Sequence, residues 1–267
     1  MTRALIVYVA LTALMLAVFA LLPGLDLAVA HLFYDRGGFI GHDSLERFGR
    51  DFFRVTPFVV LTLYAGLWLA KRRGVAVRWA PSGRAMIFLI ATIAIGPGLI
   101  VNLGLKDHWH RPRPVQTQEF GGPSEFRPWY DESGACKKNC SFVSGEAATG
   151  FWMVAPASVL PEPWRAPAII AAFAFGVGAS LLRMAFGGHY LSDVLLGGLI
   201  TLIVIEIARM VIWPRPGVET PEGRREGESK TAAELVDAAL HGGSPAPEPP
   251  PRLPHRPSGG PPPPLRG

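Results

Sequence analysis

Long apolar stretches with almost no charge constrain this chain more than any other feature. Residues 4–22 carry no charged side chain, residues 84–105 carry one at their start, and residues 191–205 carry one near theirs. A helix of about 20 residues, rising ~1.5 Å per residue, matches the ~30 Å hydrocarbon layer of a bilayer. Hydrophobic residues make up 49% of the chain and charged residues only 18%, which is unusual for a soluble enzyme. The sequence therefore predicts an integral membrane protein.

The apolar pattern predicts an all-α, polytopic membrane fold in which six transmembrane helices, within residues 1–213, form a bundle. The expected spans are residues 4–22, 55–70, 84–105, 144–160, 167–183 and 191–213. The first span is longer than the apolar part of a usual signal peptide, and no small-x-small cleavage site follows it before Pro23. We therefore expect it to be retained as a helix.

The basic residues predict how the helices are oriented. Five of them cluster around the loop between the second and third spans: Lys71, Arg72, Arg73, Arg78 and Arg84. Loops rich in Lys and Arg stay in the cytoplasm, so both termini are expected there too. The loops at residues 23–54, 106–143 and 184–190 then lie on the outer side, which for a bacterial inner membrane is the periplasm. The net charge of +5 fits this orientation better than it fits nucleic-acid binding.

Two segments outside the spans differ from the rest. Residues 214–267 contain 14 prolines and bury too little apolar surface to fold, so we expect a mostly disordered cytoplasmic tail. A capping-box pattern from Thr231 to Glu234 predicts one short helix within it. Residues 23–54 are too polar to span and contain several aromatic residues, which suit either a helix at the membrane interface or a simple connector.

Two cysteines, Cys136 and Cys140, fall in the expected outer loop. In an oxidising compartment they can form a disulfide, which is our first expectation. His108 and His110 allow a zinc site as a second interpretation, because Cys and His are the usual zinc ligands. Two reduced thiols are the third.

Polar residues that can handle a phosphate gather at three places beside the spans. The last of these places contains Arg183, His189 and Asp193. His189 and Asp193 are four residues apart and share one face if a helix begins there. A carboxylate on one ring nitrogen fixes the tautomer and leaves the other nitrogen as a nucleophile, while Arg183 offers a planar fork for phosphate oxygens. The alternative is a structural His–Asp pair at the membrane interface.

The first place is the outer loop, which contains four cations: Lys106, Arg111, Arg113 and Arg127. The positive-inside trend does not explain them. Prolines on both sides of Arg113 stiffen the backbone, so we expect the loop to hold its cations outward as a cradle for an anion. Attraction to anionic lipid head groups is the alternative.

The middle place is Ser144-Gly145-Glu146, at the start of the fourth expected span. The first N–H groups of a helix lack internal partners and bind anions, and Gly145 permits close approach of the backbone. Ser144 alternatively serves only as an N-cap. Glu146 suits a phosphate site if burial or the incoming anion keeps it protonated, because it can then donate a proton to the leaving oxygen. Its alternative role is an ion pair with a site cation.

Together the three places resemble the motifs of the type-2 phosphatidic acid phosphatase superfamily, which includes bacterial lipid phosphatases and the vanadium haloperoxidases. The first family motif is Lys, six residues, then Arg-Pro, as in residues 106–114. The second is Pro-Ser-Gly-His, and residues 143–146 match only its Ser-Gly, with Glu146 in place of the His. The third is Ser-Arg, five residues, His, three residues, Asp. Residues 183–193 match it from the Arg onward, and Leu182 stands in place of the Ser.

The resemblance implies a role for each residue. His189 would attack phosphorus and form a phosphohistidine, and Asp193 would orient it. The groups that would hold the phosphoryl oxygens are Lys106, Arg113, Arg183 and the amides at Ser144 and Gly145. Because fixed cations then neutralise the phosphate, the scheme needs no metal and no cofactor.

The second motif departs from the family at the residue that handles the proton. In the family its His protonates the leaving group, and Glu146 occupies that position here. We expect Glu146 to take over this role. The alternatives are that His108 or His110 does so, or that activity is weakened.

The function that follows is hydrolysis of a phosphate monoester of a membrane lipid at the periplasmic face. The Ser-Gly-Glu variant and the long outer loop make lipid A phosphatases the most similar branch. Other candidate substrates are undecaprenyl diphosphate, phosphatidylglycerol phosphate and phosphatidic acid. A lipid phosphotransferase and a non-catalytic lipid-binding relative are the alternatives, whereas the apolar spans exclude a soluble haloperoxidase.

Overall fold

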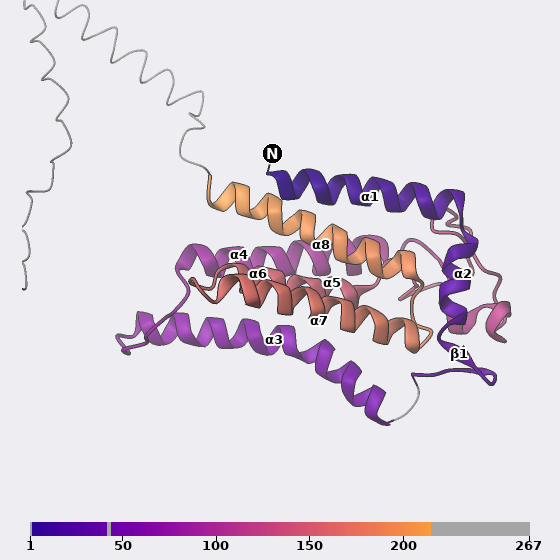
Figure 1. Cartoon of the computed structure of the whole chain (residues 1–267), viewed down its shortest axis with the longest axis horizontal. Helices are drawn as coiled ribbons and strands as arrows, with labels where there is room; N and C mark the ends of the chain where they lie inside the picture. The colour runs from indigo at the N-terminus through magenta and orange to yellow at the C-terminus, as the bar shows by residue number, and fades with distance from the viewer. Residues whose placement is uncertain (1, 42–43, 215–267) are drawn as a thin grey trace, which may run out of the picture. The chain divides into compact units, whose positions relative to one another are not determined.

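Helices make up nearly all regular structure in the computed structural model, which describes residues 2–41 and 44–214 (Figure 1). The α-helices in chain order are α1 (Arg3–Leu21), α2 (Gly24–His31), α3 (Ser44–Arg72), α4 (Gly83–Ile93), α5 (Gly145–Trp152), α6 (Val154–Ser158), α7 (Arg165–Ala185) and α8 (Leu191–Ile212). The predicted proline-rich tail, including the helix expected at Thr231, lies outside the described residues apart from Pro214.

Three shorter kinds of element complete the described chain. A π-helix, η1 (Ala94–Leu105), continues α4 without interruption. The 3-10 turns η2 (Pro114–Gln116) and η3 (Gln118–Phe120) lie in the loop before α5. Strands β1 (Tyr34–Asp35) and β2 (Gly38–Phe39) pair antiparallel as a small hairpin, with Tyr34 opposite Phe39.

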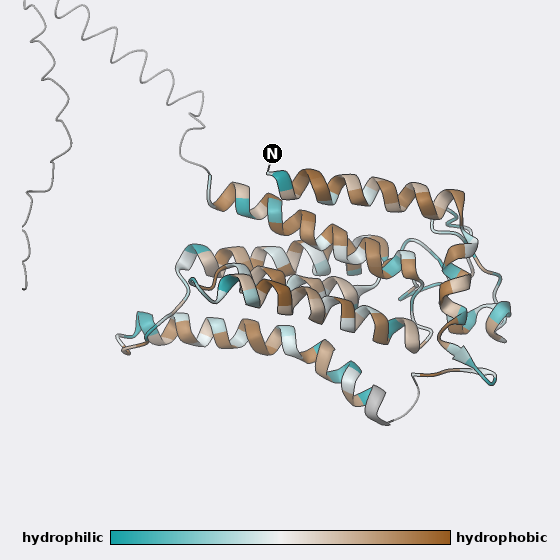
Figure 2. Ribbon diagram, in the orientation of Figure 1, coloured by the Kyte–Doolittle hydropathy of each residue, from teal (hydrophilic) through white to brown (hydrophobic). Residues whose placement is uncertain are grey.

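Among the residues that the structure describes, five helical segments are long and apolar enough to cross a membrane. They are Arg3–Leu21, Arg47–Arg72, Gly83–Leu105, Arg165–Ala185 and Leu191–Ile212. Figure 2 shows apolar residues predominating along α1, α7 and α8. The predicted all-α, polytopic membrane fold is confirmed, but the predicted number of six spans is not.

The fourth expected span, residues 144–160, folds as two short consecutive helices, α5 and α6. α5 packs against both α7 and α8. Gly150 allows this close approach, because a Cβ there would lie 3.0 Å from the Cβ of Ala179 and 3.3 Å from the Cα of Gly176. Small residues at such contacts are typical of helices that pack within membranes. The apolar composition of α5 therefore reflects its place inside the protein.

Local signals fix where several helices begin and end. Thr2, Ser82 and Ser144 are the N-caps of α1, α4 and α5, and each side chain accepts a hydrogen bond from a backbone N–H of the first turn. Pro97 lies inside η1, where it supplies no N–H. η1 then ends directly before Lys106, the first residue of the outer cluster.

Residues 23–54 form neither a single interfacial helix nor a plain connector. They contain α2, the β-hairpin and the beginning of α3. The rings of Tyr34, Phe39 and Phe120 have centroids 5.1–5.2 Å apart, so the hairpin packs against the loop before α5. On α3, the ring of Phe53 lies 4.7 Å from that of Phe175 on α7. Aromatic contacts therefore attach this segment to the bundle.

All three polar clusters lie at one end of the bundle. η1 and α7 end there, and α5 and α8 begin there. In Figure 1 this end carries α2 and the hairpin, while the loop between α3 and α4 lies at the opposite end. The helices thus bring residues from distant parts of the sequence to one face.

A disulfide joins Cys136 and Cys140, as first expected. The zinc interpretation is therefore wrong, because both sulfur atoms are already bonded. Within residues 2–41 and 44–214, no group of three or more His, Cys, Asp or Glu side chains is placed to hold a metal ion.

Candidate active site

His189 lies just before α8 and is only 1% exposed. Its Nδ1 is 2.7 Å from the carbonyl oxygen of Ser141, whereas Oδ2 of Asp193 is 3.8 Å away. A carbonyl oxygen can only accept, so the neutral ring carries its proton on Nδ1 and keeps a lone pair on Nε2. Burial lowers the pKa of His189 to about 3, which keeps the ring neutral near pH 7. The expected tautomer is thus present, but the Ser141 carbonyl, not Asp193, fixes it.

Asp193 is fully buried at the start of α8, and several donors hold its carboxylate. Oδ2 accepts from the Ser141 hydroxyl and from the backbone N–H of Tyr190, the latter at 2.9 Å. Oδ1 accepts from NH1 of Arg111 at 2.6 Å. Asp193 therefore acts on His189 partly through Ser141, which contacts both side chains.

Arg111 is a structural residue, contrary to its predicted place in the anion cradle. It is fully buried and its NH2 lies 2.7 Å from Oδ2 of Asp26 on α2. Burial alone lowers the pKa of Arg111, but the carboxylates of Asp193 and Asp26 raise it above its ordinary value. Its guanidinium also lies over the ring of Tyr190, 4.4 Å from the centroid. With every edge engaged, Arg111 cannot bind a substrate phosphate.

Arg183, at the end of α7, has a buried donor that no other group satisfies within the described residues. It is 4% exposed, and its Nε has no hydrogen-bond partner among the described residues. Oε1 of Glu146 lies 3.6 Å from this Nε, which is an ion-pair distance but not a hydrogen bond. Gly188 lies against the guanidinium, since a Cβ there would come within 2.3 Å of NH2. A buried donor without a partner is costly, and a phosphate oxygen would satisfy it.

Lys106 and Arg113 belong to the same electrostatic environment as Arg183. Burial first, and then the charges of Arg113 and Arg183, lower the pKa of Lys106 to about 8. Burial likewise lowers the pKa of Arg113, whose Nε and NH2 both donate to the carbonyl oxygen of Asn139, at 3.2 and 2.8 Å. Charges of Arg183 and Arg113 also disfavour protonation of His189. The first and third clusters are therefore brought together around the imidazole.

Glu146 lies among these cations. Its Oε1 accepts from Nε and NH2 of Arg50 on α3, at 3.3 and 3.2 Å, and faces Arg183. This is the ion-pair arrangement that the sequence left as an alternative to a proton donor. His108 and His110, also considered as donors, place Nδ1 2.8 Å from the carbonyl oxygens of Gly104 and Cys136, respectively.

Ser144 and Gly145 are placed differently from each other at the start of α5. The N–H of Ser144 donates to the carbonyl oxygen of Asp193 at 3.0 Å, and its hydroxyl accepts from the Ala147 N–H. The N–H of Ser144 is therefore not free for a phosphate, and its hydroxyl acts as the N-cap of α5. Gly145 contacts η1, where a Cβ would come within 2.5 Å of Oδ1 of Asn102. A larger residue at this position would have to displace the Asn102 amide.

Comparison with known proteins identifies the family. The sequence model of the PAP2 superfamily matches residues 84–216. A Lipid A 4'-phosphatase of Francisella tularensis subsp. novicida (strain U112) is 38% identical over 194 residues, which cover 69% of this chain and 85% of that protein. The chain belongs to the PAP2 superfamily.

Two further curated proteins are similar to this chain over most of its length. Lipid A 4'-phosphatases of Rhizobium leguminosarum and Rhizobium etli are 35% and 36% identical over 205 residues. These matches cover 71% of this chain and 88% and 80% of the two relatives. No solved structure matches the chain.

Sequence reasoning missed several residues of this PAP2 site. Asp26 and Ser141 were not singled out from the sequence. Asp26 acts through a buried carboxylate and Ser141 through its backbone carbonyl, and neither belongs to a recognisable sequence motif. Arg50 had a usable signal, since it is a cation on a largely aromatic stretch of the expected outer side. Ser192 also joins the network, where its hydroxyl donates to Oδ2 of Asp26 at 2.6 Å.

Proposed function

We propose that this PAP2 protein is a lipid phosphatase that hydrolyses a phosphate monoester of lipid A. The names of its curated relatives support the substrate. The observation that carries the chemistry is the buried, neutral His189 beside cations that include an incompletely hydrogen-bonded Arg183. Such a site provides a nucleophile and a binding place for a phosphoryl group.

In the proposed reaction, Nε2 of His189 attacks phosphorus while the bond from phosphorus to the lipid oxygen breaks. Lys106, Arg113 and Arg183 neutralise the charge on the other phosphoryl oxygens. The ring becomes cationic as the new P–N bond forms, and Asp193 at 3.8 Å stabilises it. Water then attacks phosphorus, releases inorganic phosphate and restores the neutral ring.

Glu146 is the proposed source of the proton that the leaving oxygen takes up. The arriving phosphate competes for Arg183 and Arg50, the two ion-pair partners of Glu146. A carboxylate that loses its cations and gains an anion as a neighbour takes up a proton more readily. It can then deliver that proton to the departing lipid and recover one from the attacking water.

The proposed location is the inner membrane, with the site at the periplasmic face and both termini in the cytoplasm. The basic residues Lys71 and Arg72 end α3, and Arg73 follows it, at the opposite end of the bundle from His189. By the positive-inside rule that end is cytoplasmic. The proline-rich residues 214–267 would then follow α8 into the cytoplasm.

Phosphate release from purified protein in detergent with EDTA tests the function. Lipid A should lose phosphate faster than phosphatidic acid or undecaprenyl diphosphate, and His189→Asn should abolish release. The His108→Asn variant is the matched control, because it changes a second outer-side histidine and should retain activity. Equal release by His189→Asn and the unaltered protein would contradict the proposal, as would transfer of the phosphate to another lipid without release.

A further inference from the structure

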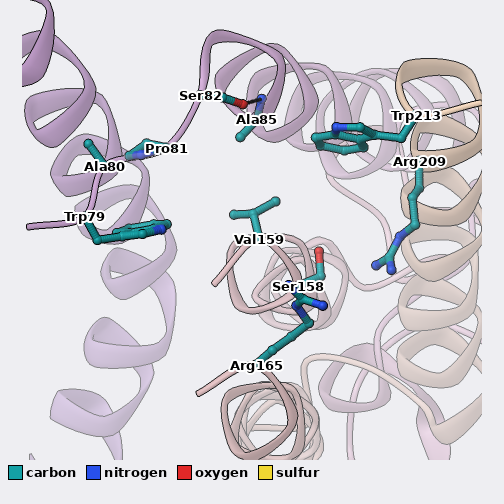
Figure 3. Close-up of a pocket in the computed structure, with 10 residues that line it drawn as sticks. All are labelled: Trp79, Ala80, Pro81, Ser82, Ala85, Ser158, Val159, Arg165, Arg209 and Trp213. Atoms are coloured by element: carbon teal, nitrogen blue, oxygen red, sulfur yellow. Dashed lines mark hydrogen bonds between the residues drawn. The ribbon is translucent and has the colours of Figure 1, made fainter. Parts of the chain in front are cut away.

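A cavity of ≈ 530 Å³ lies at the end of the bundle opposite His189. The loop before α4, the turn between α6 and α7, and the end of α8 contribute to its wall. Figure 3 shows Trp79 and Trp213 on two sides of the space, with Val159 between them. Tryptophan is enriched where membranes meet water, because its ring is apolar and its N–H is polar. The wall therefore has the composition of a membrane interface.

Two arginines supply charge to this cavity, and in Figure 3 their side chains extend toward the same space, one from the start of α7 and one from α8. Arg165 donates from Nε to the Leu160 carbonyl oxygen at 3.0 Å, and its NH1 is 3.2 Å from Oε1 of Glu162. Arg209 has Nε 3.7 Å from Oε1 of Glu206 and donates no hydrogen bond within the part of the chain that the structure describes. Each arginine thus meets a carboxylate on one side only, and donors remain for a ligand.

We propose that this cavity binds the phosphate group of an anionic phospholipid. Two planar guanidinium groups can each hold phosphate oxygens through paired hydrogen bonds, which a single lysine cannot do. Basic pockets between transmembrane helices are suited to lipid head groups, and this one lies at the start of α7 and the end of α8, the level expected for phospholipid head groups. The basic end of α3 and loop 73–82 add attraction for an anion at the same side. A bound lipid would link the turn before α7 to the end of α8.

Native mass spectrometry of delipidated protein titrated with dioleoyl phosphatidylglycerol tests this site. Arg165→Gln/Arg209→Gln should weaken binding about tenfold to thirtyfold, because two charge-assisted contacts are lost. Arg72→Gln/Arg73→Gln is the matched control, since it removes two charges from the same end without touching the cavity wall, and should weaken binding less than about threefold. Phosphatidylcholine has no net charge. It should bind the unaltered protein no more tightly than phosphatidylglycerol binds the Arg165→Gln/Arg209→Gln variant.

Equal losses in the two double variants would overturn the proposal in favour of diffuse attraction to the basic end. Equal binding of phosphatidylcholine and phosphatidylglycerol would also overturn it. Displacement of the lipid by about 1 mM inorganic phosphate would reassign the cavity to free phosphate and contradict the lipid assignment. If the double variant does not purify as a single species, Arg209→Gln alone should give about a threefold to fivefold loss, and an unchanged affinity would count against the site.

Discussion

The Nδ1 proton of His189 is committed to the Ser141 carbonyl, and that hydrogen bond determines which ring nitrogen can react. Ser141 also donates its hydroxyl to Asp193, so one residue orients the nucleophile through its backbone and holds the carboxylate through its side chain. The remaining polar groups divide by environment. Arg111 is saturated by its partners, while Arg183 is not, and only the second is suited to bind a substrate.

Replacement of Glu146 by Gln separates a proton donor from a structural ion pair. Gln cannot protonate the leaving oxygen, so turnover of an alkyl phosphate such as lipid A should fall about 10²-fold or more. Turnover of p-nitrophenyl phosphate should fall much less, because its leaving oxygen needs no proton. Steady-state rates on both substrates check this. Arg50→Lys is the control for a weakened ion pair, and a parallel loss on both substrates in Glu146→Gln would rule out the acid role.

Lys106 should give the enzyme an alkaline limit. Its pKa of about 8 means that the ammonium is charged below that pH and neutral above it, so phosphate binding weakens as the pH rises through 8. In a plot of kcat/KM against pH, we expect kcat/KM to fall about tenfold or more on this alkaline limb, since a charge-assisted hydrogen bond to the phosphate is lost. In Lys106→Arg the charge persists, and the limb should move upward by more than one pH unit. An unchanged limb in Lys106→Arg would assign it to another group.

At the scale of elements, Arg111 joins three parts of the chain that are far apart in sequence. It belongs to the loop after η1 and pairs with Asp26 on α2 and Asp193 on α8, 85 and 82 residues away. Both carboxylates are buried, so each depends on this one guanidinium for its charge partner. The network therefore fixes the outer loop against the start of α8, where Asp193 also lies 3.8 Å from the imidazole.

Removing this guanidinium should cost more than removing an exposed one. Arg111→Met leaves two buried carboxylates without their cation, which typically costs about 3–5 kcal/mol. Arg127→Met is the matched control, because its partners Glu125 and Asp131 are both reached by solvent and such pairs contribute about 1 kcal/mol or less each. Thermal unfolding in detergent compares the two, and Asp26→Asn added to Arg111→Met should recover part of the loss. Similar melting temperatures for both single variants would contradict this account.

At the scale of the whole molecule, the sequence predicts those features that depend on local pattern. The lengths of the apolar stretches predict the five apolar helices. The positions of the cysteines and of the motifs along the sequence predict the disulfide and the end of the bundle that carries the motifs. Residues 144–160 could not be assigned in this way, because an apolar helix buried among others looks like one that faces lipid. The partners of Glu146 and Asp193 also escaped prediction, since Arg50 is 96 residues from Glu146 and Arg111 has no distinguishing motif.

The bond between Cys136 and Cys140 has a further implication for when the protein becomes competent. It closes the short loop that contains Asn139, and the carbonyl oxygen of Asn139 accepts hydrogen bonds from Nε and NH2 of Arg113. On the proposed topology these thiols meet oxidants only after export. A newly made chain would thus complete this part of its site only in the periplasm, where its proposed substrate lies. Phosphorylated metabolites in the cytoplasm would not be hydrolysed by it.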